Sequence, residues 1–178
     1  MRIISGIRKG LKLKSPEGMN TRPTTDRVKE SVFNLLQFRI PCDSVLDLFA
    51  GSGALGIEAI SRHCTHAIFV DQNRQAIALI QENIGAAHFQ ESATVVCKDA
   101  LSFLMECQSS FDLIFLDPPY NRGLLQPVLE EIAQRNLLNE DGIIVVESEE
   151  NGESLEDFPF SIRRIAKYGK TVITLLQR

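Results

Sequence analysis

The stretch Asp47-Leu-Phe-Ala-Gly51-Ser-Gly53-Ala-Leu-Gly56 joins a predicted strand, Ser44–Phe49, to a predicted helix, Ala54–Ser61. Its glycines allow a tight turn and a close approach of the backbone to a ligand. Their spacing, Gly-x-Gly-x-x-Gly, is typical of nucleotide-binding units when a strand precedes them and a helix follows. Asp71 ends the next predicted strand, 20 residues after Gly51, where a carboxylate can accept hydrogen bonds from both ribose hydroxyls. The stretch therefore predicts an α/β fold with a nucleoside site.

Strands and helices alternate through the rest of the chain. This spacing predicts a parallel sheet with right-handed crossovers. Near the end, two apolar segments flank the tight turn Tyr168-Gly169-Lys170 and predict an antiparallel hairpin. We expect a doubly wound, mostly parallel seven-stranded sheet with helices on both faces. Beyond the first unit, the predicted strands are Ala67–Asp71, Ala93–Cys97, Phe111–Leu116, Gly142–Glu147, Ser161–Lys167 and Thr171–Leu176, and the predicted helices are Arg74–Ile84, Ala100–Glu106 and 124–135.

Residues 1–41 precede this pattern, and we expect them to form an extension to a domain of residues 42–178. Segments 2–5 and 11–14 alternate around a glycine-bounded loop and predict a β-hairpin. A helix should follow, with Thr24 or Thr25 as its N-cap. Its apolar face is formed by Val28, Val32, Leu35 and Leu36.

The charge is unevenly distributed. Residues 1–30, Lys29 among them, carry eight basic and three acidic side chains, a net charge of +5, whereas the remainder has eleven basic and twenty acidic side chains, a net charge of −9. A basic arm on an acidic body indicates contact with a polyanion on one face, or a merely solvated basic hairpin. Glu147, Glu149 and Glu150 are interpreted as a solvated acidic edge.

The composition fits a soluble globular protein: 44% of the residues are hydrophobic and 24% are charged. No apolar run approaches the roughly 20 residues needed to span a bilayer, and the amino terminus lacks the apolar core of a signal peptide. The cysteines form no Cys-x-x-Cys pair, so reduced buried thiols, no metal site, no membrane contact and a cytoplasmic location are expected. They are Cys42, Cys64, Cys97 and Cys107.

Two acidic residues favour one nucleoside over another. Asp47 precedes the glycines, where a carboxylate suits an ammonium group and would repel a pyrophosphate. Asp99 follows the third predicted strand, where it can accept from an adenine amino group or cap the next helix, and one residue can do both. S-adenosylmethionine has a ribose, an adenine and an ammonium group but no phosphate, so it fits better than a nicotinamide dinucleotide.

A second motif, Asp117-Pro118-Pro119-Tyr120, follows the apolar strand Phe111–Leu116. Two consecutive prolines supply no backbone N–H, so the segment cannot continue a strand ladder. It can present a carboxylate, carbonyl groups and an aromatic face at the carboxyl end of a strand, where open α/β sheets bind ligands. Taken alone, it is equally compatible with an ordinary loop.

Together, Asp47-Leu-Phe-Ala-Gly-Ser-Gly53 and Asp117-Pro-Pro-Tyr120 resemble the amino-group methyltransferases of the class I, Rossmann-like S-adenosylmethionine fold. Arg22-Pro-Thr-Thr-Asp-Arg-Val-Lys-Glu30 and Lys167-Tyr-Gly-Lys-Thr171 resemble the RsmD family more closely. The resemblance covers essentially the whole chain. It implies methylation of a guanine 2-amino group in small-subunit (16S) ribosomal RNA, guanine 966 in the usual ribosomal numbering, within an assembled or assembling particle.

The resemblance implies a site without metal in a chain that we expect to be a monomer. Asp117 and the Pro118 carbonyl would accept the two N–H groups of the amine, and Tyr120 would stack on the base. Arg22 or Thr24 would touch the methionine end of the cofactor, although Thr24 is equally readable as a cap. The expected catalytic residues are Asp117, Pro118, Pro119 and Tyr120; the cofactor residues are Arg22, Thr24, Asp47, Ala50, Gly51, Ser52, Gly53, Asp71, Gln72, Asp99 and Ala100; the RNA contacts are Arg8, Lys9, Lys12, Lys14, Arg163, Arg164 and Lys170.

The sequence departs from the family pattern at Lys98, where a glycine is expected, and at Leu11, where a basic residue is expected. Asp71 is shorter than the glutamate that is at least as usual there. Leu11 puts in doubt how strongly the hairpin grips RNA. Three alternatives stay open: an adenine-N6 methyltransferase, an NAD-dependent oxidoreductase, and a non-catalytic RNA-binding assembly factor.

Overall fold

A computed structural model describes residues 1–15, 26–119, 123–149 and 159–178. These residues contain one seven-stranded sheet in the order β3-β2-β1-β4-β5-β7-β6. The first five strands run parallel, β7 is antiparallel to β5, and β6 is antiparallel to β7. The predicted fold class is confirmed. The strands are β1 (Ser44–Asp47), β2 (His66–Asp71), β3 (Ala93–Cys97), β4 (Phe111–Leu116), β5 (Leu138–Glu149), β6 (Ser161–Tyr168) and β7 (Thr171–Gln177).

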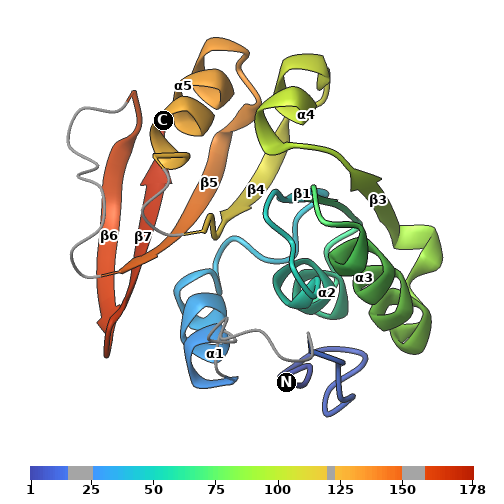
Figure 1. Ribbon diagram of the computed structural model, residues 1–178. Helices are drawn as coiled ribbons and strands as arrows, with labels where there is room; N and C mark the ends of the chain where they lie inside the picture. Colours follow the sequence, from blue (N-terminus) through green and yellow to red (C-terminus); the bar gives the residue numbers. More distant parts are fainter. Residues whose placement is uncertain (16–25, 120–122, 150–158) are drawn as a thin grey trace.

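Five helices of the described residues cover the two faces of the sheet (Figure 1). Helices α1, α2 and α3 pack over one face, and α4 and α5 pack over the other. None of the helices in these parts of the chain is long and apolar enough to cross a membrane. The helices are α1 (Asp26–Leu35), α2 (Ala54–Ser61), α3 (Arg74–Ala87), α4 (Ala100–Glu106) and α5 (Leu125–Gln134), with a single 3₁₀ turn at Gln90–Ser92.

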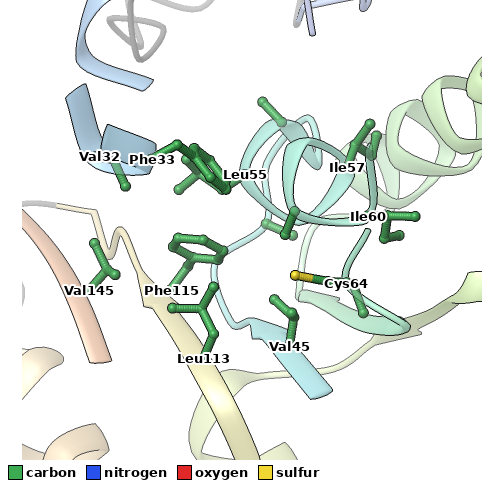
Figure 2. Packing of buried hydrophobic residues seen from close by; sticks show 14 of the residues in the cluster. Val32, Phe33, Val45, Leu55, Ile57, Ile60, Cys64, Leu113, Phe115 and Val145 are labelled. Carbon is green, nitrogen blue, oxygen red and sulfur yellow. The ribbon is translucent and has the colours of Figure 1, made fainter. Parts of the chain in front are cut away.

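The central strand β4 contributes side chains to the hydrophobic cores on both faces of the sheet, because successive side chains of a strand point to opposite faces. Leu113 and Phe115 enter the core beneath α1 and α2, while Ile114 and Leu116 enter the core beneath α5. Figure 2 shows the first core, in which Phe33 of α1 faces Phe115 with ring centroids 5.8 Å apart. Packing on both faces places the carboxyl end of β4 rigidly in the middle of the sheet.

The amino-terminal segment forms a short version of the predicted hairpin. Arg2 bridges to Lys12, the Ile3 N–H donates to the Leu11 carbonyl at 2.9 Å, and the Leu13 N–H donates to the Met1 carbonyl at 3.0 Å. The N–H groups of Ile4 and Ser5 donate to the Glu58 carboxylate of α2, at 2.7 and 2.9 Å. The hairpin is thus paired with itself through its first residues and attached to α2 through the residues that follow. The predicted N-caps of α1, Thr24 and Thr25, lie outside the described residues.

Glu58 also accepts two cationic partners. Its carboxylate lies 3.1 Å from the Lys29 ammonium and 2.9 Å from the Arg62 guanidinium, and Lys29 donates to the Arg2 carbonyl at 2.5 Å. Both Lys29 and Glu58 are completely buried. Burial lowers the pKa of Lys29, an effect that the Glu58 carboxylate opposes. Counting Lys29 with a basic surface arm was therefore wrong, since its charge joins α1, α2 and the amino-terminal segment inside the protein.

The four cysteines are free thiols. Cys64 is buried, but Cys97 is exposed, so the expectation that all of them are buried was wrong.

Candidate active site

The glycine loop lies at the carboxyl end of β1. The Ala50 N–H donates to the Val70 carbonyl, and the Gly53 N–H donates back to Ala50 at 2.7 Å, closing a tight turn. Gly53 takes a φ of +76°, which favours glycine. At Gly56, a Cβ would come within 2.3 Å of the Phe69 ring, so the absence of a side chain lets α2 pack against β2. The loop and the start of α2 are held close to the neighbouring strand.

Asp71, at the end of β2, holds this loop from the side. One carboxylate oxygen accepts the Gly51 N–H at 3.0 Å, and the other accepts the Asn73 N–H at 2.8 Å. Each oxygen retains further acceptor capacity. The residue therefore positions the glycine loop and presents a carboxylate beside it.

Asp99 follows β3 and caps helix α4. Its carboxylate accepts the Ser102 N–H at 3.1 Å and the Ser102 hydroxyl at 3.3 Å. The cap interpretation of Asp99 is confirmed. The side chain is exposed at the same sheet edge as Asp71, which leaves its second predicted role available.

Asp47 ends β1 inside the protein, with 3% of its surface exposed. Its carboxylate accepts the Gly56 N–H at 3.0 Å. Burial raises the pKa of Asp47 to about 7, the Gly56 hydrogen bond opposes that rise, and the nearby Asp71 charge adds to it. The Asp47 carboxylate thus accepts the Gly56 N–H in the first turn of α2, a group that a bound phosphate would otherwise approach.

Asp117 follows β4 directly, with Pro118 buried and Pro119 exposed beyond it. Burial raises the pKa of Asp117 well above its ordinary value, and the charges of Glu147 and Asp47 raise it further. Glu147 is 8% exposed. It lies next to Asp117 because β4 and β5 run parallel with Leu116 opposite Val146.

The interpretation of Glu147 as part of a solvated edge was wrong, although Glu149 is exposed as predicted. Glu150 lies outside the described residues. The sequence did contain a signal for Glu147. Three apolar strands each end on an acid, in Val45-Leu-Asp47, Phe115-Leu-Asp117 and Val145-Val-Glu147. We call Asp47, Asp117 and Glu147 the carboxylate cluster.

The structure brings most predicted cofactor residues to one edge of the sheet. Ala50 and Ser52 are buried in the glycine loop, Gln72 is exposed after β2, and Ala100 begins α4. Arg22, Thr24 and Tyr120 lie outside the described residues. No group of three or more His, Cys, Asp or Glu side chains in the described residues is arranged to hold a metal ion.

The predicted RNA contacts fall into two groups rather than one. In the amino-terminal segment, Arg8 donates to the Ala87 carbonyl at 2.8 Å and Lys14 pairs with Glu82, while Lys9 and Lys12 are exposed. In the second group, the exposed residues Arg163 and Arg164 lie on β6 and Lys170 lies in the following turn. Figure 1 shows the amino-terminal segment near α2 and α3, with β6 at the far edge of the sheet.

The strand order, the antiparallel β7 and the glycine loop after β1 define a class I methyltransferase fold, which solved methyltransferases of low sequence identity also adopt.

Sequence comparison places the chain within this class. The model of the family described as Conserved hypothetical protein 95 matches residues 1–177. YlbH of Bacillus subtilis is 41% identical over 100% of this chain and 99% of its own length, and Ribosomal RNA small subunit methyltransferase D of Escherichia coli is 37% identical over 100% and 90%. The solved structure of yhhF from Escherichia coli superposes with a TM-score of 0.90 at 36% identity, covering 100% of this chain and 97% of that one. The chain belongs to this family, the RsmD family.

Proposed function

We propose that this chain transfers a methyl group from S-adenosylmethionine to the exocyclic N2 amine of a guanine in small-subunit ribosomal RNA, at guanine 966. The relatives named as ribosomal RNA methyltransferases support the RNA substrate. The observation that carries the proposal is the carboxylate cluster at the ends of the parallel strands, where burial and the charges of Glu147 and Asp47 raise the pKa of Asp117. A cationic ligand opposes such a rise.

The donor set fits S-adenosylmethionine and disfavours a dinucleotide. The N–H groups of Gly51 and Gly56 at the glycine loop already donate to Asp71 and Asp47. A pyrophosphate there would meet two carboxylates instead of free N–H groups. When bound, S-adenosylmethionine supplies an electrophilic methyl group on a positively charged sulfur. Asp47 would face its positive charges, Asp71 its ribose and Asp99 its adenine, beside Ala50, Ser52, Gly53, Gln72 and Ala100, with Arg22 and Thr24 at its methionine end.

Asp117 and the Pro118 carbonyl would accept the two N–H groups of the guanine amine and orient its lone pair. A raised pKa suits Asp117 to take the proton that this nitrogen releases once it is methylated. Positioning the amine in line with the methyl group supplies much of the rate enhancement. Pro119 would shape the turn, and Tyr120 would stack on a base that has left its own stack.

We also propose that the chain acts as a monomer in the cytoplasm, on a small subunit that is assembled or assembling. Residues 1–41 would serve as an RNA-facing extension of the domain formed by residues 42–178. Arg8, Lys9, Lys12 and Lys14 on the extension and Arg163, Arg164 and Lys170 near the carboxyl end would meet phosphates.

The test is transfer of a radiolabelled methyl group to small subunits from cells that lack the enzyme, followed by digestion to nucleosides. The expected product is 2-methylguanosine. Labelled N6-methyladenosine would show that the target base is adenine and not guanine. RNA binding without transfer would favour an assembly factor, and a fluorescence change with NADH would favour an oxidoreductase.

A further inference from the structure

A groove of about 340 Å³ lies between α1 and β6, away from the carboxylate cluster. This volume is at the lower end of the roughly 300–1,000 Å³ of small-molecule sites. It is lined by two aromatic residues, two amide residues and an arginine, with no acidic residue: Ser31, Asn34, Leu35, Gln37, Phe38, Arg164 and Tyr168. The groove thus brings together aromatic, amide and cationic residues.

Phe38 is the most exposed large hydrophobic residue of the described chain, with 90% of its surface exposed. It lies just after α1, in the turn that follows Leu35. Leaving such a ring in water forgoes the free energy of its burial. Unpaired nucleotides are commonly bound by stacking on aromatic side chains of this kind.

One lining residue of the groove, Tyr168, lies at the same sheet edge as the carboxylate cluster. Tyr168 ends β6 opposite Thr171 of β7, and Thr171 lies opposite Glu149 at the carboxyl end of β5. From β4, which ends at Asp117, the sheet continues through β5 and β7 to β6. Three strand spacings of about 4.8 Å, with two residues of about 3.3 Å along the strand, separate the two positions by roughly 16 Å. A strand of RNA whose target base reaches Asp117 therefore has neighbouring nucleotides within reach of Tyr168.

The charge of this region complements a polyanion. Residues 159–178 contain five basic side chains and no acidic one, although the whole chain has a net charge of −4. Arg164 lines the groove, so a phosphate held there would have a guanidinium within reach.

We propose that this groove binds one unpaired nucleotide of the RNA substrate, close to the nucleotide that is methylated. Phe38 and Tyr168 stack on its base, Asn34 and Gln37 offer hydrogen bonds to the base edge, and Arg164 binds its phosphate. The inference rests on the proposed function in so far as it takes RNA as the substrate.

The first test measures methyl transfer to small subunits by Phe38→Ala and Arg164→Ala. Each should raise the KM for the subunit roughly tenfold, the size expected for one lost stacking or phosphate contact. The kcat at saturating subunit and the dissociation constant of S-adenosylmethionine should not change. The matched control is Ile165→Ala, since Ile165 is 54% exposed and lies on the opposite face of β6, across from Thr174 rather than Leu175. An unchanged KM in Phe38→Ala would overturn the proposal.

The second test uses photo-cross-linking to small subunits by a protein with p-benzoylphenylalanine in place of Phe38. The expected cross-link is to ribosomal RNA, near the target nucleotide. A cross-link to a ribosomal protein, or no cross-link at all, would overturn the proposal that the groove binds a nucleotide. This experiment requires no methyl transfer, so a wrong reaction and a wrong groove give different results.

Discussion

Glu58 of α2 and the carboxylate cluster differ in the charges that surround them. Glu58 is surrounded by Lys29, Arg62 and the N–H groups of Ile4 and Ser5. In the carboxylate cluster, the charges that act on Asp117 are those of other acids. Buried charges are tolerated when they are paired and hydrogen-bonded. Glu58 therefore belongs to the architecture, whereas Asp117 stands beside other acids at the carboxyl end of β4.

Removing Glu58 should have the largest effect on stability. We expect Glu58→Ala to lower the free energy of unfolding by about 3–5 kcal/mol, because the buried Lys29 ammonium loses its partner. Urea denaturation of the ligand-free protein measures this loss. The double variant Lys29→Met, Glu58→Leu removes both charges and should recover part of it. A loss of less than about 1 kcal/mol in Glu58→Ala would show that the pair does not hold these segments together.

Asp117→Asn should lower activity and not stability, because it removes a charge that neighbouring acids repel. We expect methyl transfer to fall about 10²- to 10³-fold, the usual cost of one lost transition-state contact. The dissociation constant of S-adenosylmethionine in calorimetry should change only a few-fold. Glu149→Gln, which alters an exposed acid at the end of β5, is the matched control. If a folded Asp117→Asn lost cofactor binding and transfer together, its assigned role would be wrong.

The free energy of unfolding should depend on pH through Asp47, a member of the carboxylate cluster. Burial raises its pKa from 3.8 to about 7, so the native state holds this proton more tightly than the unfolded state does. The stabilising contribution is complete below about pH 4 and is lost as the pH rises through about 7. Between pH 5 and pH 8 the loss is about 2–3 kcal/mol. Asp47→Asn should flatten the pH dependence of the urea midpoint; an identical slope would contradict the protonated state of Asp47.

Asp71 should show the smallest effect, because it is partly exposed and its role is in binding. Asp71→Ala is expected to raise the dissociation constant of S-adenosylmethionine about tenfold, through loss of a charge-assisted hydrogen bond. The variant also frees the Gly51 N–H, so circular dichroism must first show that the fold is intact. Glu91→Gln, a change at an exposed acid in the turn before β3, serves as control. An unchanged constant would remove Asp71 from the cofactor site.

The fold was predictable because its signals are local. Buried parallel strands read as continuous apolar runs, and α2, β3, α4 and β4 begin and end at the predicted residues. The alternation of residues 2–5 and 11–14 also predicted the amino-terminal hairpin. The attachment of this hairpin was not predictable, because the N–H groups of Ile4 and Ser5 donate to Glu58, in a helix more than 50 residues away.

The candidate site was predictable where an acid precedes a glycine loop or begins a distinctive motif, as at Asp47 and Asp117. Glu147 was missed because it was grouped with the acids that follow it rather than with the strand that precedes it. Only the pairing of β4 with β5 brings Glu147 beside Asp117. Lys29 was missed for a related reason, since its burial depends on a partner in α2.

Strand β6 has a further consequence as the last strand of its sheet. Among the residues that the structure describes, no strand of this sheet pairs with one of its sides, and the backbone N–H and C=O groups there are a template on which a second chain can add. Charged side chains blunt such edges, and β6 carries Arg163, Arg164 and Lys167. Arg163 and Arg164, which are proposed to hold RNA, therefore also oppose edge-to-edge aggregation. Neutralising several of these cations at once should lower the solubility of the protein, and this loss would obscure any effect on RNA binding. Single substitutions leave most of the edge charge in place.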